Sequence, residues 1–214
     1  MKKTICMVVV LLAFVKLAVA QYDPNAKKVL DNMSRKYKAI PAFRANVSYS
    51  LVNETENLNE EYTGKVIVKG DKYFLALAGQ EVINDGETLW TYLEEINEVN
   101  ITNYDPDDEE FTPSKIYNIY ESGYKYTLLA EVVMGGQPVN VVELVPEDQN
   151  SQFFKVTLYI GKADSSLKSW RTFDRNGNVY VYTISDFKED ATIQDSFFKF
   201  DAAAHEGVEE VDFR

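Results

Sequence analysis

The chain has 214 residues, and its 22 Lys and Arg against 34 Asp and Glu give a formal net charge of −12. Such an acidic chain is repelled by phosphate backbones and by anionic lipid surfaces, which argues against nucleic acid as a partner and against general adhesion to membranes. The length suits a single domain with a sizeable core.

The first twenty residues predict export. Lys2 and Lys3 form a basic start, residues 5–15 are apolar, and Ala18-Val19-Ala20 supplies the small residues that precede a cleavage site. This pattern is typical of a secretory signal peptide cleaved after Ala20. A membrane anchor is the alternative, but the apolar run is short and Lys16 interrupts it. We therefore predict a signal peptide over residues 1–20 and one domain over residues 21–214, working in a bacterial periplasm.

Cleavage would change both the charge and the thiol content of the chain. The signal holds three of the 22 basic residues, so 19 basic residues remain against 34 acidic ones, a net charge of −15. Cys6 is the only cysteine and lies within the signal. The mature chain would therefore carry no thiol and no disulfide, and an oxidising compartment would not affect it.

The mature chain begins with an amphipathic helix. Asp23 is a good N-cap, and Pro24 suits the first turn. Apolar residues then recur at steps of three and four until Pro41, which stops the helix. These apolar positions are Ala26, Val29, Leu30, Met33, Tyr37 and Ile40.

Beyond Pro41 the apolar period changes to two, which is typical of half-buried strands. Turn signals such as Gly70-Asp71, Asp85-Gly86 and Asn176-Gly177 separate the segments. Their short, even spacing indicates an antiparallel meander rather than βαβ units. The predicted strands are residues 43–51, 62–69, 73–77, 81–84, 88–93, 98–102, 124–131, 139–145, 153–160, 167–174 and 178–187.

One break interrupts the meander. Residues 105–110 form an acidic loop, and Pro113-Ser114 can open a short helix that carries Ile116, Tyr117 and Tyr120. A sheet of about eleven twisted strands tends to curl, and the two helices are the natural cover for its concave side. We predict a mostly β fold: an unclosed antiparallel barrel with a helical lid.

Sequence signatures of catalysis are scarce. His205 is the only histidine, and no nucleophile elbow, H-E-x-x-H pair, phosphate loop or dinucleotide-binding turn is present. We therefore predict no catalytic residue and no cofactor. Carboxylates alone can catalyse hydrolysis, so an enzyme acting on lipids or glycans stays open as one alternative.

Two acidic stretches resemble calcium loops without matching them. Residues 105–110 lack the ligand spacing of an EF-hand. Asp174, Asn176 and Asn178 match the start of such a loop, but its sixth and twelfth positions are Val179 and Ser185. A solvated loop and a hairpin turn account for these residues better, so no metal site is predicted.

The remaining signal is aromatic. Aromatic side chains recur along the alternating strand faces, and Trp90 and Tyr92 fall on the same side of one strand. They either fill a solid core or line a cavity that stays open, and composition alone favours the core.

Several short segments, in order and with compatible spacing, resemble the LolA family of periplasmic lipoprotein carriers in its Bacteroidetes form. The segment D-G-E-T-L-W-T-Y at residues 85–92 is similar to the family's strand after its D-G turn. The resemblance covers nearly all of the mature chain. Its other segments are residues 40–45, residues 64–69 with Tyr73-Phe74, residues 198–201 and residues 205–212.

The resemblance implies an unclosed β-barrel whose apolar interior holds the acyl chains of a lipoprotein. Such a carrier is a monomer that takes cargo from an inner-membrane ABC-type release complex and delivers it to the outer membrane, where an acceptor can receive it. Where the family commonly has the arginine and proline of its lid latch, this chain has Gly70-Asp71. The arginine latch is therefore not carried over.

On this basis we predict an apolar lipid-binding lining on the strands and the lid. The strand residues are Phe43, Val47, Tyr49, Val66, Val68, Phe74, Trp90 and Tyr92, and the lid residues are Ile116, Tyr117 and Tyr120. A sensor or scaffold domain of the same fold, which binds lipid or protein without transporting it, is the second alternative.

Overall fold

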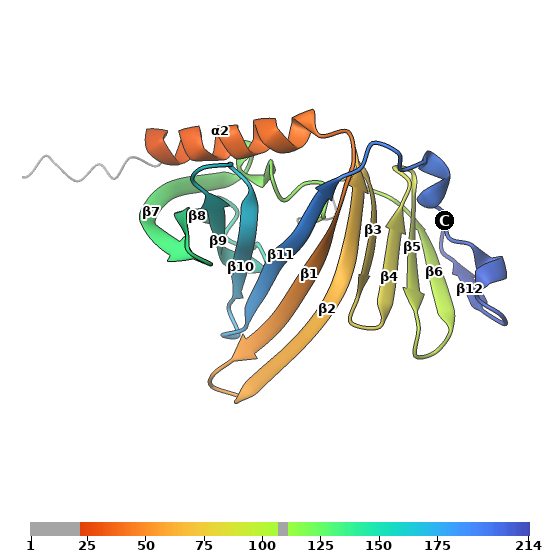
Figure 1. The fold of residues 1–214 in the computed structure, drawn as a ribbon. Coiled ribbons are helices and arrows are strands. Elements are labelled where there is room, and N and C mark those ends of the chain that lie inside the picture. Colours follow the sequence, from red (N-terminus) through yellow and green to blue (C-terminus); the bar gives the residue numbers. More distant parts are fainter. Residues whose placement is uncertain (1–21, 107–110) are drawn as a thin grey trace, which may run out of the picture.

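A computed structural model describes residues 22–106 and 111–214 of the chain. The predicted signal peptide and most of the predicted acidic loop lie outside the described residues. One α-helix and a single twelve-stranded sheet account for most of the described chain (Figure 1). The predicted mostly β fold with an unclosed sheet is confirmed.

The helix α2 spans Pro24–Ala39 and begins and ends as predicted. The Asp23 carboxylate accepts a hydrogen bond from the backbone N–H of Asn25 at 2.8 Å, which satisfies a free donor of the first turn. The helix ends before Pro41, because the residue preceding a proline disfavours helical geometry. Its buried side is formed by Ala26, Leu30, Met33, Ser34 and Tyr37.

Each of the eleven predicted strands is present, with bounds that differ by a few residues. Their bounds are β1 Phe43–Asn53, β2 Leu58–Lys69, β3 Lys72–Leu77, β4 Gln80–Asn84, β5 Thr88–Leu93, β6 Glu98–Asn103, β7 Tyr124–Met134, β8 Gln137–Pro146, β9 Phe153–Gly161, β10 Leu167–Asp174 and β11 Val179–Glu189. Every pairing among these eleven strands is antiparallel.

A twelfth strand, β12 (Glu209–Asp212), pairs in parallel with β6. The sequence pattern predicts only a short tail there, because four mostly exposed residues carry no alternation. The order across the sheet is β12-β6-β5-β4-β3-β2-β1-β11-β10-β9-β8-β7, so β1 lies beside β11 and the sheet does not close.

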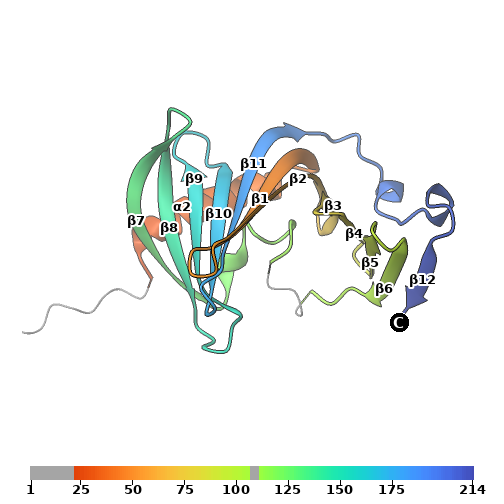
Figure 2. The ribbon, with the colours of Figure 1, turned by 90° about the horizontal axis from the view of Figure 1, so that it is seen from below.

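The sheet bends into an arch. Figure 2 shows β7 to β10 forming one limb, β3 to β6 with β12 the other, and β11, β1 and β2 the bend between them. Register shifts between Arg44 and Asn46, between Leu128 and Ala130 and at both ends of β10 accompany this curvature. Such bulges increase the local twist and bend of a strand.

Two further segments cover the arch. The helix α2 lies across one end of the limb formed by β7 to β10 (Figure 1), and residues 111–121, the described part of the connection that leads into β7, lie on the hollow side (Figure 2). The main core lies between α2, this connection and the concave face of the sheet. The outer face of the other limb has its own small core, formed by Tyr92, Val99 and Ile101 with Trp90, Phe200 and Val208.

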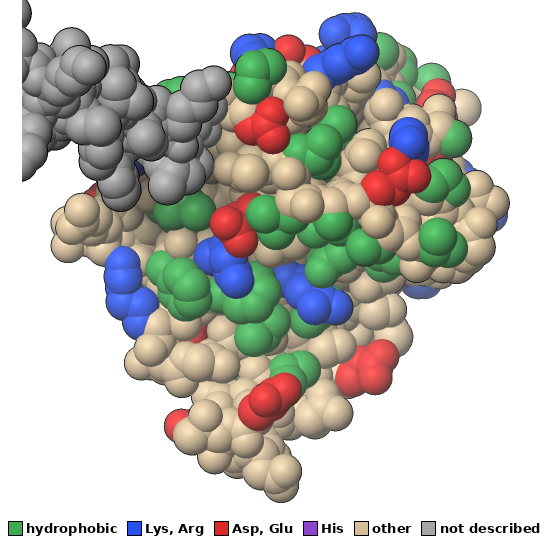
Figure 3. All heavy atoms as spheres, turned by 90° about the vertical axis from the view of Figure 1, so that its left-hand side faces the viewer, with side chains coloured by type: hydrophobic (Ala, Val, Ile, Leu, Met, Phe, Trp, Pro, Cys, Tyr) green, Lys and Arg blue, Asp and Glu red, His purple; other side chains and the backbone are tan. Residues whose placement is uncertain are grey.

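The strand β7 forms one edge of the sheet, and an isolated bridge joins it to Tyr22 at Tyr126. Figure 3 views the molecule from this side, where hydrophobic side chains lie among both basic and acidic ones. Leu129 and Val133 of β7 are 52% and 73% exposed. The mixed charges of this face suit an edge that must not pair with another chain.

The predicted short helix after Pro113 is not formed. Residues 113–118 make consecutive turns, and only Ile119–Glu121 forms a 3-10 helix. The backbone N–H groups of Lys115, Asn118 and Glu121 each donate to the carbonyl three residues before. Hydrogen bonds to the third preceding residue are those of 3-10 turns, which rarely continue for more than a few residues.

Candidate functional site: an apolar cavity under the lid

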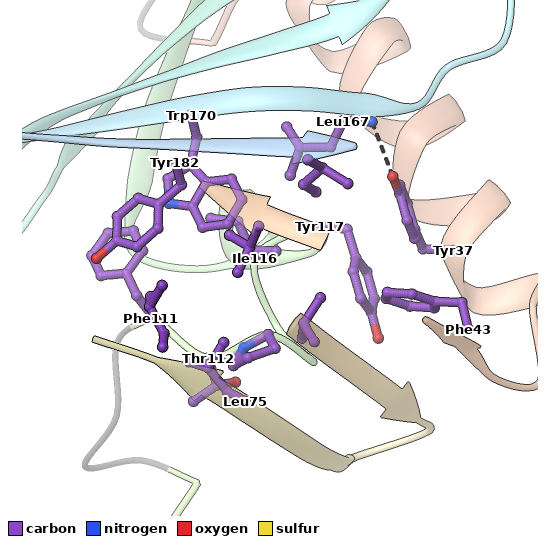
Figure 4. A pocket seen from close by; sticks show the side chains of 15 residues that line it. Tyr37, Phe43, Leu75, Phe111, Thr112, Ile116, Tyr117, Leu167, Trp170 and Tyr182 are labelled. Atoms are coloured by element: carbon purple, nitrogen blue, oxygen red, sulfur yellow. Dashed lines mark hydrogen bonds between the residues drawn. The ribbon is translucent and has the colours of Figure 1, made fainter. Parts of the chain in front are cut away.

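A cavity of about 130 Å³ lies between the concave face of the sheet and residues 111–121, which we call the lid (Figure 4). Its lining comes from α2, from strands β1, β2, β3, β10 and β11 and from the lid, and it is apolar apart from Thr112, the tyrosine hydroxyls and the indole N–H of Trp170. The lining residues are Tyr37, Phe43, Val47, Val66, Leu75, Leu77, Phe111, Thr112, Pro113, Ile116, Tyr117, Leu167, Trp170, Tyr182 and Ile184.

The floor of the cavity follows from strand alternation. In an antiparallel pair, residues directly opposite each other point to the same face. Phe43 lies opposite Val68, and Val66 lies opposite Leu75, so the odd residues of β1, the even residues of β2 and the odd residues of β3 share the concave face. This register brings Val47, Val66 and Leu75 together.

Gly64 allows two strands of the cavity floor to pack closely. Gly64 lies opposite Val47, and a Cβ atom added there would stand 2.1 Å from the carbonyl oxygen of Ala76. A backbone oxygen cannot move aside as the end of a side chain can. The absence of a side chain at Gly64 therefore lets β3 approach β2 where the cavity begins.

A second wall comes from β10 and β11. Val47 lies opposite Ile184, and Tyr182 lies opposite Trp170. The rings of Trp170 and Tyr182 stack with centroids 4.6 Å apart and planes 8° apart. Figure 4 shows this pair at one end of the cavity and Tyr37 with Phe43 at the other.

Tyr37 joins helix, lid and sheet. Its ring stacks on Tyr117 of the lid at 5.1 Å and meets Phe43 and Phe187 edge-on at 5.8 Å each. Its hydroxyl accepts a hydrogen bond from the backbone N–H of Leu167 at 3.1 Å. Burial raises the pKa of Tyr37 to about 12, so the hydroxyl stays protonated at neutral pH.

The lid is fastened to α2 beyond the cavity. The hydroxyl of Tyr120 donates to the Asp31 carboxylate at 2.9 Å. Ser34 donates to Glu121 at 3.2 Å, and the ammonium of Lys38 lies 2.5 Å from the same carboxylate. These polar contacts hold the far end of the lid, whereas its cavity end is held by apolar contacts.

The cavity is electrically neutral. Its titratable lining groups are the tyrosines Tyr37, Tyr117 and Tyr182, and burial is the main cause that raises the pKa of each hydroxyl. Among the described residues, no carboxylate or amine lines the cavity to move a proton. The arrangement therefore suits binding of a hydrocarbon group rather than acid–base chemistry.

The single histidine of the chain lies away from the cavity. His205 lies on the outer face, where its ring contacts Tyr92 at 4.4 Å and Phe200 at 4.6 Å. Within residues 22–106 and 111–214, no three His, Cys, Asp or Glu residues are grouped so that they could hold a metal ion. In the same ranges, no helix has the length and apolarity needed to cross a bilayer.

The size of the cavity limits what it holds in this conformation. An engineered cavity of about 150 Å³ takes up one benzene molecule. At about 130 Å³, the present cavity is of that order and too small for a complete acyl chain. Binding of a long chain would require the lid side chains Ile116 and Tyr117 to move away from the sheet.

The structure brings part of the predicted lining together. Phe43, Val47, Val66, Ile116 and Tyr117 line the cavity. Val68 and Tyr120 lie in the adjoining core, 2% and 6% exposed, without lining the cavity. Tyr49 lies on the concave face just beyond the lining, against Tyr182 at 5.1 Å.

The remaining three predicted residues lie on the opposite face of the sheet. Phe74 is adjacent to Leu75 in β3 and therefore points away from the cavity, where it meets Phe197 at 5.5 Å. Trp90 lies opposite Ile83, and Tyr92 packs on Phe200 at 5.6 Å. These three side chains do not line this cavity, and the C-terminal segment covers the outer face of this limb and gives it a core of its own.

Sequence reasoning did not single out ten of the fifteen lining residues. Leu167, Trp170, Tyr182 and Ile184 belong to predicted strands, but β10 and β11 are brought to the cavity by the β1–β11 pairing. Two strands that lie so far apart in the sequence leave no local sequence pattern that shows they pair. Tyr37 was visible as an apolar helix position, and Phe111 was visible only as an aromatic residue two positions before Pro113.

Residues 76–201 match the sequence model of a family described as outer membrane lipoprotein carrier protein LolA. This match covers more than half of the chain. The chain belongs to the LolA family. No curated protein matches the chain. The matched family is one of carriers, and LolA-type binding or sorting of lipoproteins is the activity for which such an apolar cavity is suited.

Solved structures resemble the LolA-family fold described above. An uncharacterised conserved protein from Thermus thermophilus is 16% identical, with a TM-score of 0.59, over 88% of this chain and 99% of that one. A LolA superfamily protein from Nitrosomonas europaea is 15% identical, with a TM-score of 0.47, over 83% and 98%. A putative outer membrane lipoprotein-sorting protein domain from Vibrio parahaemolyticus is 17% identical, with a TM-score of 0.43, over 81% and 97%.

Proposed function

We propose that this protein is a periplasmic carrier of the Bacteroidetes type, which binds acyl chains of lipoproteins in the cavity and moves them from the inner to the outer membrane. The observation that carries the proposal is the uncharged, apolar cavity between lid and sheet, in a chain of the LolA family. Export with cleavage after Ala20, a single domain over residues 21–214 and a monomeric state belong to the same proposal.

Release of the cargo limits how such a site can bind. Each methylene removed from water gains about 0.8 kcal/mol, so whole acyl chains would be held by tens of kcal/mol relative to water. The competing state, however, is a bilayer or another apolar pocket, and the net transfer free energy between two apolar environments is small. A lining of Val, Leu, Ile and aromatic side chains without ionic contacts suits this exchange.

The partners follow from the proposed route. Loading needs a donor in the inner membrane, an ABC-type lipoprotein-release complex, and delivery needs the outer membrane or an acceptor in it. Neither transfer needs hydrolysis by this chain, which agrees with the uncharged lining that the described residues give the cavity.

Two adjacent residues of β3 allow a matched test. Leu75 lines the cavity and Phe74 points to the opposite face. We expect Leu75→Trp to fill the cavity and to abolish binding of an environment-sensitive fatty-acid dye by the chain from Gln21 onward. Phe74→Trp, which adds volume on the other face, should keep the binding. Equal binding by the two folded variants would contradict the cavity as the lipid site.

Transport needs a separate experiment. Photo-crosslinking from position 117 in cells should trap many different lipoproteins if the protein is a carrier. A sensor or scaffold domain would instead yield one constant partner. Such a result would replace transport with the second alternative and leave the lipid cavity in place.

A further inference from the structure

Tyrosine side chains border the cavity on its open side. We call Tyr49, Tyr62, Tyr180 and Tyr182 the tyrosine rim. Tyr49 lies directly opposite Tyr62 on β2 and opposite Tyr182 on β11. Ring centroids in the rim are 5.1 Å apart for Tyr49 and Tyr182, 6.1 Å for Tyr49 and Tyr62, and 6.4 Å for Tyr49 and Tyr180.

The rim connects the cavity with solvent. Tyr182 lines the cavity and stacks on Trp170, whereas Tyr62 is 38% exposed. On its other side β2 pairs with β3 only from Lys65 to Lys69, so no described strand covers the free edge beside Tyr62. The rim therefore forms a continuous aromatic surface from the outside to the cavity.

The opposite end of the cavity is closed. Tyr37 and Phe43 are 5% and 6% exposed, and their rings meet Phe187 and Tyr117 there. An acyl chain that enters along the rim consequently points its methyl end toward α2. Its polar end then lies at the rim, where aromatic rings with hydroxyl groups suit a boundary between apolar and wet surroundings.

The hydroxyls of the rim differ in what they already bind. Tyr62 donates to Glu60 at 3.3 Å, and Tyr180 donates to Asp174 at 3.1 Å. The hydroxyls of Tyr49 and Tyr182 have no hydrogen-bond partner among the described residues. These two groups are available to donate to a carbonyl oxygen of a bound molecule.

The charge beside the rim is negative. Burial tends to raise the pKa of Asp174, but hydrogen bonds from Asn178, Asn176 and Tyr180 lower it overall, so the group is ionised at neutral pH. Glu60 lies two residues before Tyr62 and shares its face of β2. Residues 45–64 contain four glutamates and no lysine or arginine. An anionic head group at the rim would meet these carboxylates, and that stretch of β1 and β2 offers no cation to compensate.

We propose that the tyrosine rim holds the uncharged ester or amide linkage of an acylated molecule and that Glu60 and Asp174 disfavour molecules with an anionic head group. This inference rests on the proposed function, since it places the acyl chain in the cavity. It gives the protein a means to prefer neutral acyl linkages over the anionic phospholipids of the membranes it visits.

The two tryptophans provide the assay. Trp170 lines the cavity, and Trp90 lies in the small core of the outer face. A Trp90→Phe variant of the chain from Gln21 onward leaves Trp170 as the only indole. Its fluorescence is titrated with 1-palmitoylglycerol and with 1-palmitoylglycerol 3-phosphate, which share the acyl ester and differ in the phosphate.

We expect the neutral lipid to bind on the order of tenfold more tightly at low ionic strength, and the difference to shrink as salt screens the carboxylates. In the same background, Glu60→Gln should reduce the difference severalfold. Glu61→Gln is the matched control, because it removes the same charge from the neighbouring residue, which points to the other face.

Equal affinity for the two lipids, or the same reduction in Glu61→Gln as in Glu60→Gln, would overturn the role of the rim while leaving the cavity as a lipid site. Failure of both lipids to bind, in fluorescence and in equilibrium dialysis, would instead overturn the proposed function together with this inference.

Discussion

Tyr37 links three parts of the molecule through one side chain. Its ring contacts the lid and the sheet, and its hydroxyl satisfies the buried N–H of Leu167. A buried donor that loses its acceptor costs about 1–3 kcal/mol. The contribution of Tyr37 to stability is therefore both apolar and polar, and the polar part depends on the protonation of the hydroxyl.

The pH dependence of stability tests this residue. The pKa of Tyr37 is about 12 in the folded chain and about 10 when unfolded. Because the folded state resists deprotonation, stability is fully present below pH 10 and is lost between pH 10 and 12, by about 2–3 kcal/mol. Tyr37→Phe cannot ionise, so we expect it to be less stable than wild type at pH 7, with a difference that narrows above pH 10. Urea unfolding at stepped pH measures this, and a constant difference would contradict the assignment.

At the scale of elements, the contact between β2 and β3 depends on the missing side chain at Gly64. The backbone of Ala76 occupies the place where a Cβ atom would stand. Any larger residue must separate the two strands that carry Val66 and Leu75, which lie opposite each other on the cavity floor.

We expect Gly64→Ala to lower the free energy of unfolding by about 2 kcal/mol or more, because overpacking against backbone cannot relax cheaply. It should also weaken dye binding by separating the cavity floor. Thr63→Ala, at the exposed neighbouring position, is the control and should change neither quantity appreciably. Chemical denaturation and dye titration measure the two effects, and an unchanged stability of Gly64→Ala would show that the strands can adjust.

The positions of the strands were predictable because a half-buried strand has an apolar period of two. Which face forms the cavity was not, and β3 shows why. Tyr73 is buried on the concave side, while Phe74 packs on Phe197 on the outer side. Both faces are covered, so alternation gives no sign of which face is concave. Trp90 and Tyr92 were misplaced for the same reason, whereas Phe43 and Val47 lie on a strand whose alternate residues, Arg44 and Asn46, are exposed.

At the scale of the whole molecule, the C-terminal segment completes the second limb. Phe198 is fully buried, Phe200 packs on Tyr92, and β12 extends the sheet beside β6. The segment is also held by Asp195, which pairs with Lys69 and Lys72. The limb formed by β3 to β6 therefore depends on residues at the far end of the chain.

Truncation after Glu189 tests this dependence. Losing buried aromatic side chains worth about 1.5–3 kcal/mol each should lower the free energy of unfolding by at least about 3 kcal/mol. The side chains of Val99 and Ile101, on the outer face of the sheet, would become exposed, so the truncated chain should bind the dye ANS. A truncated chain with unchanged urea midpoint and no ANS binding would show that the limb is stable by itself.

The open ends of the sheet have a mechanical consequence. A closed barrel has a circumference fixed by its strand count and shear, so enlarging its interior breaks ladder hydrogen bonds. In this chain β7 and β12 end the sheet without meeting, and residues 111–121 lie on its hollow side. The arch can therefore spread by small changes of twist while the hydrogen bonds between neighbouring strands are kept. Under the proposed function, hydrocarbon tails of different girth would be accommodated at a cost set by elastic bending of the backbone.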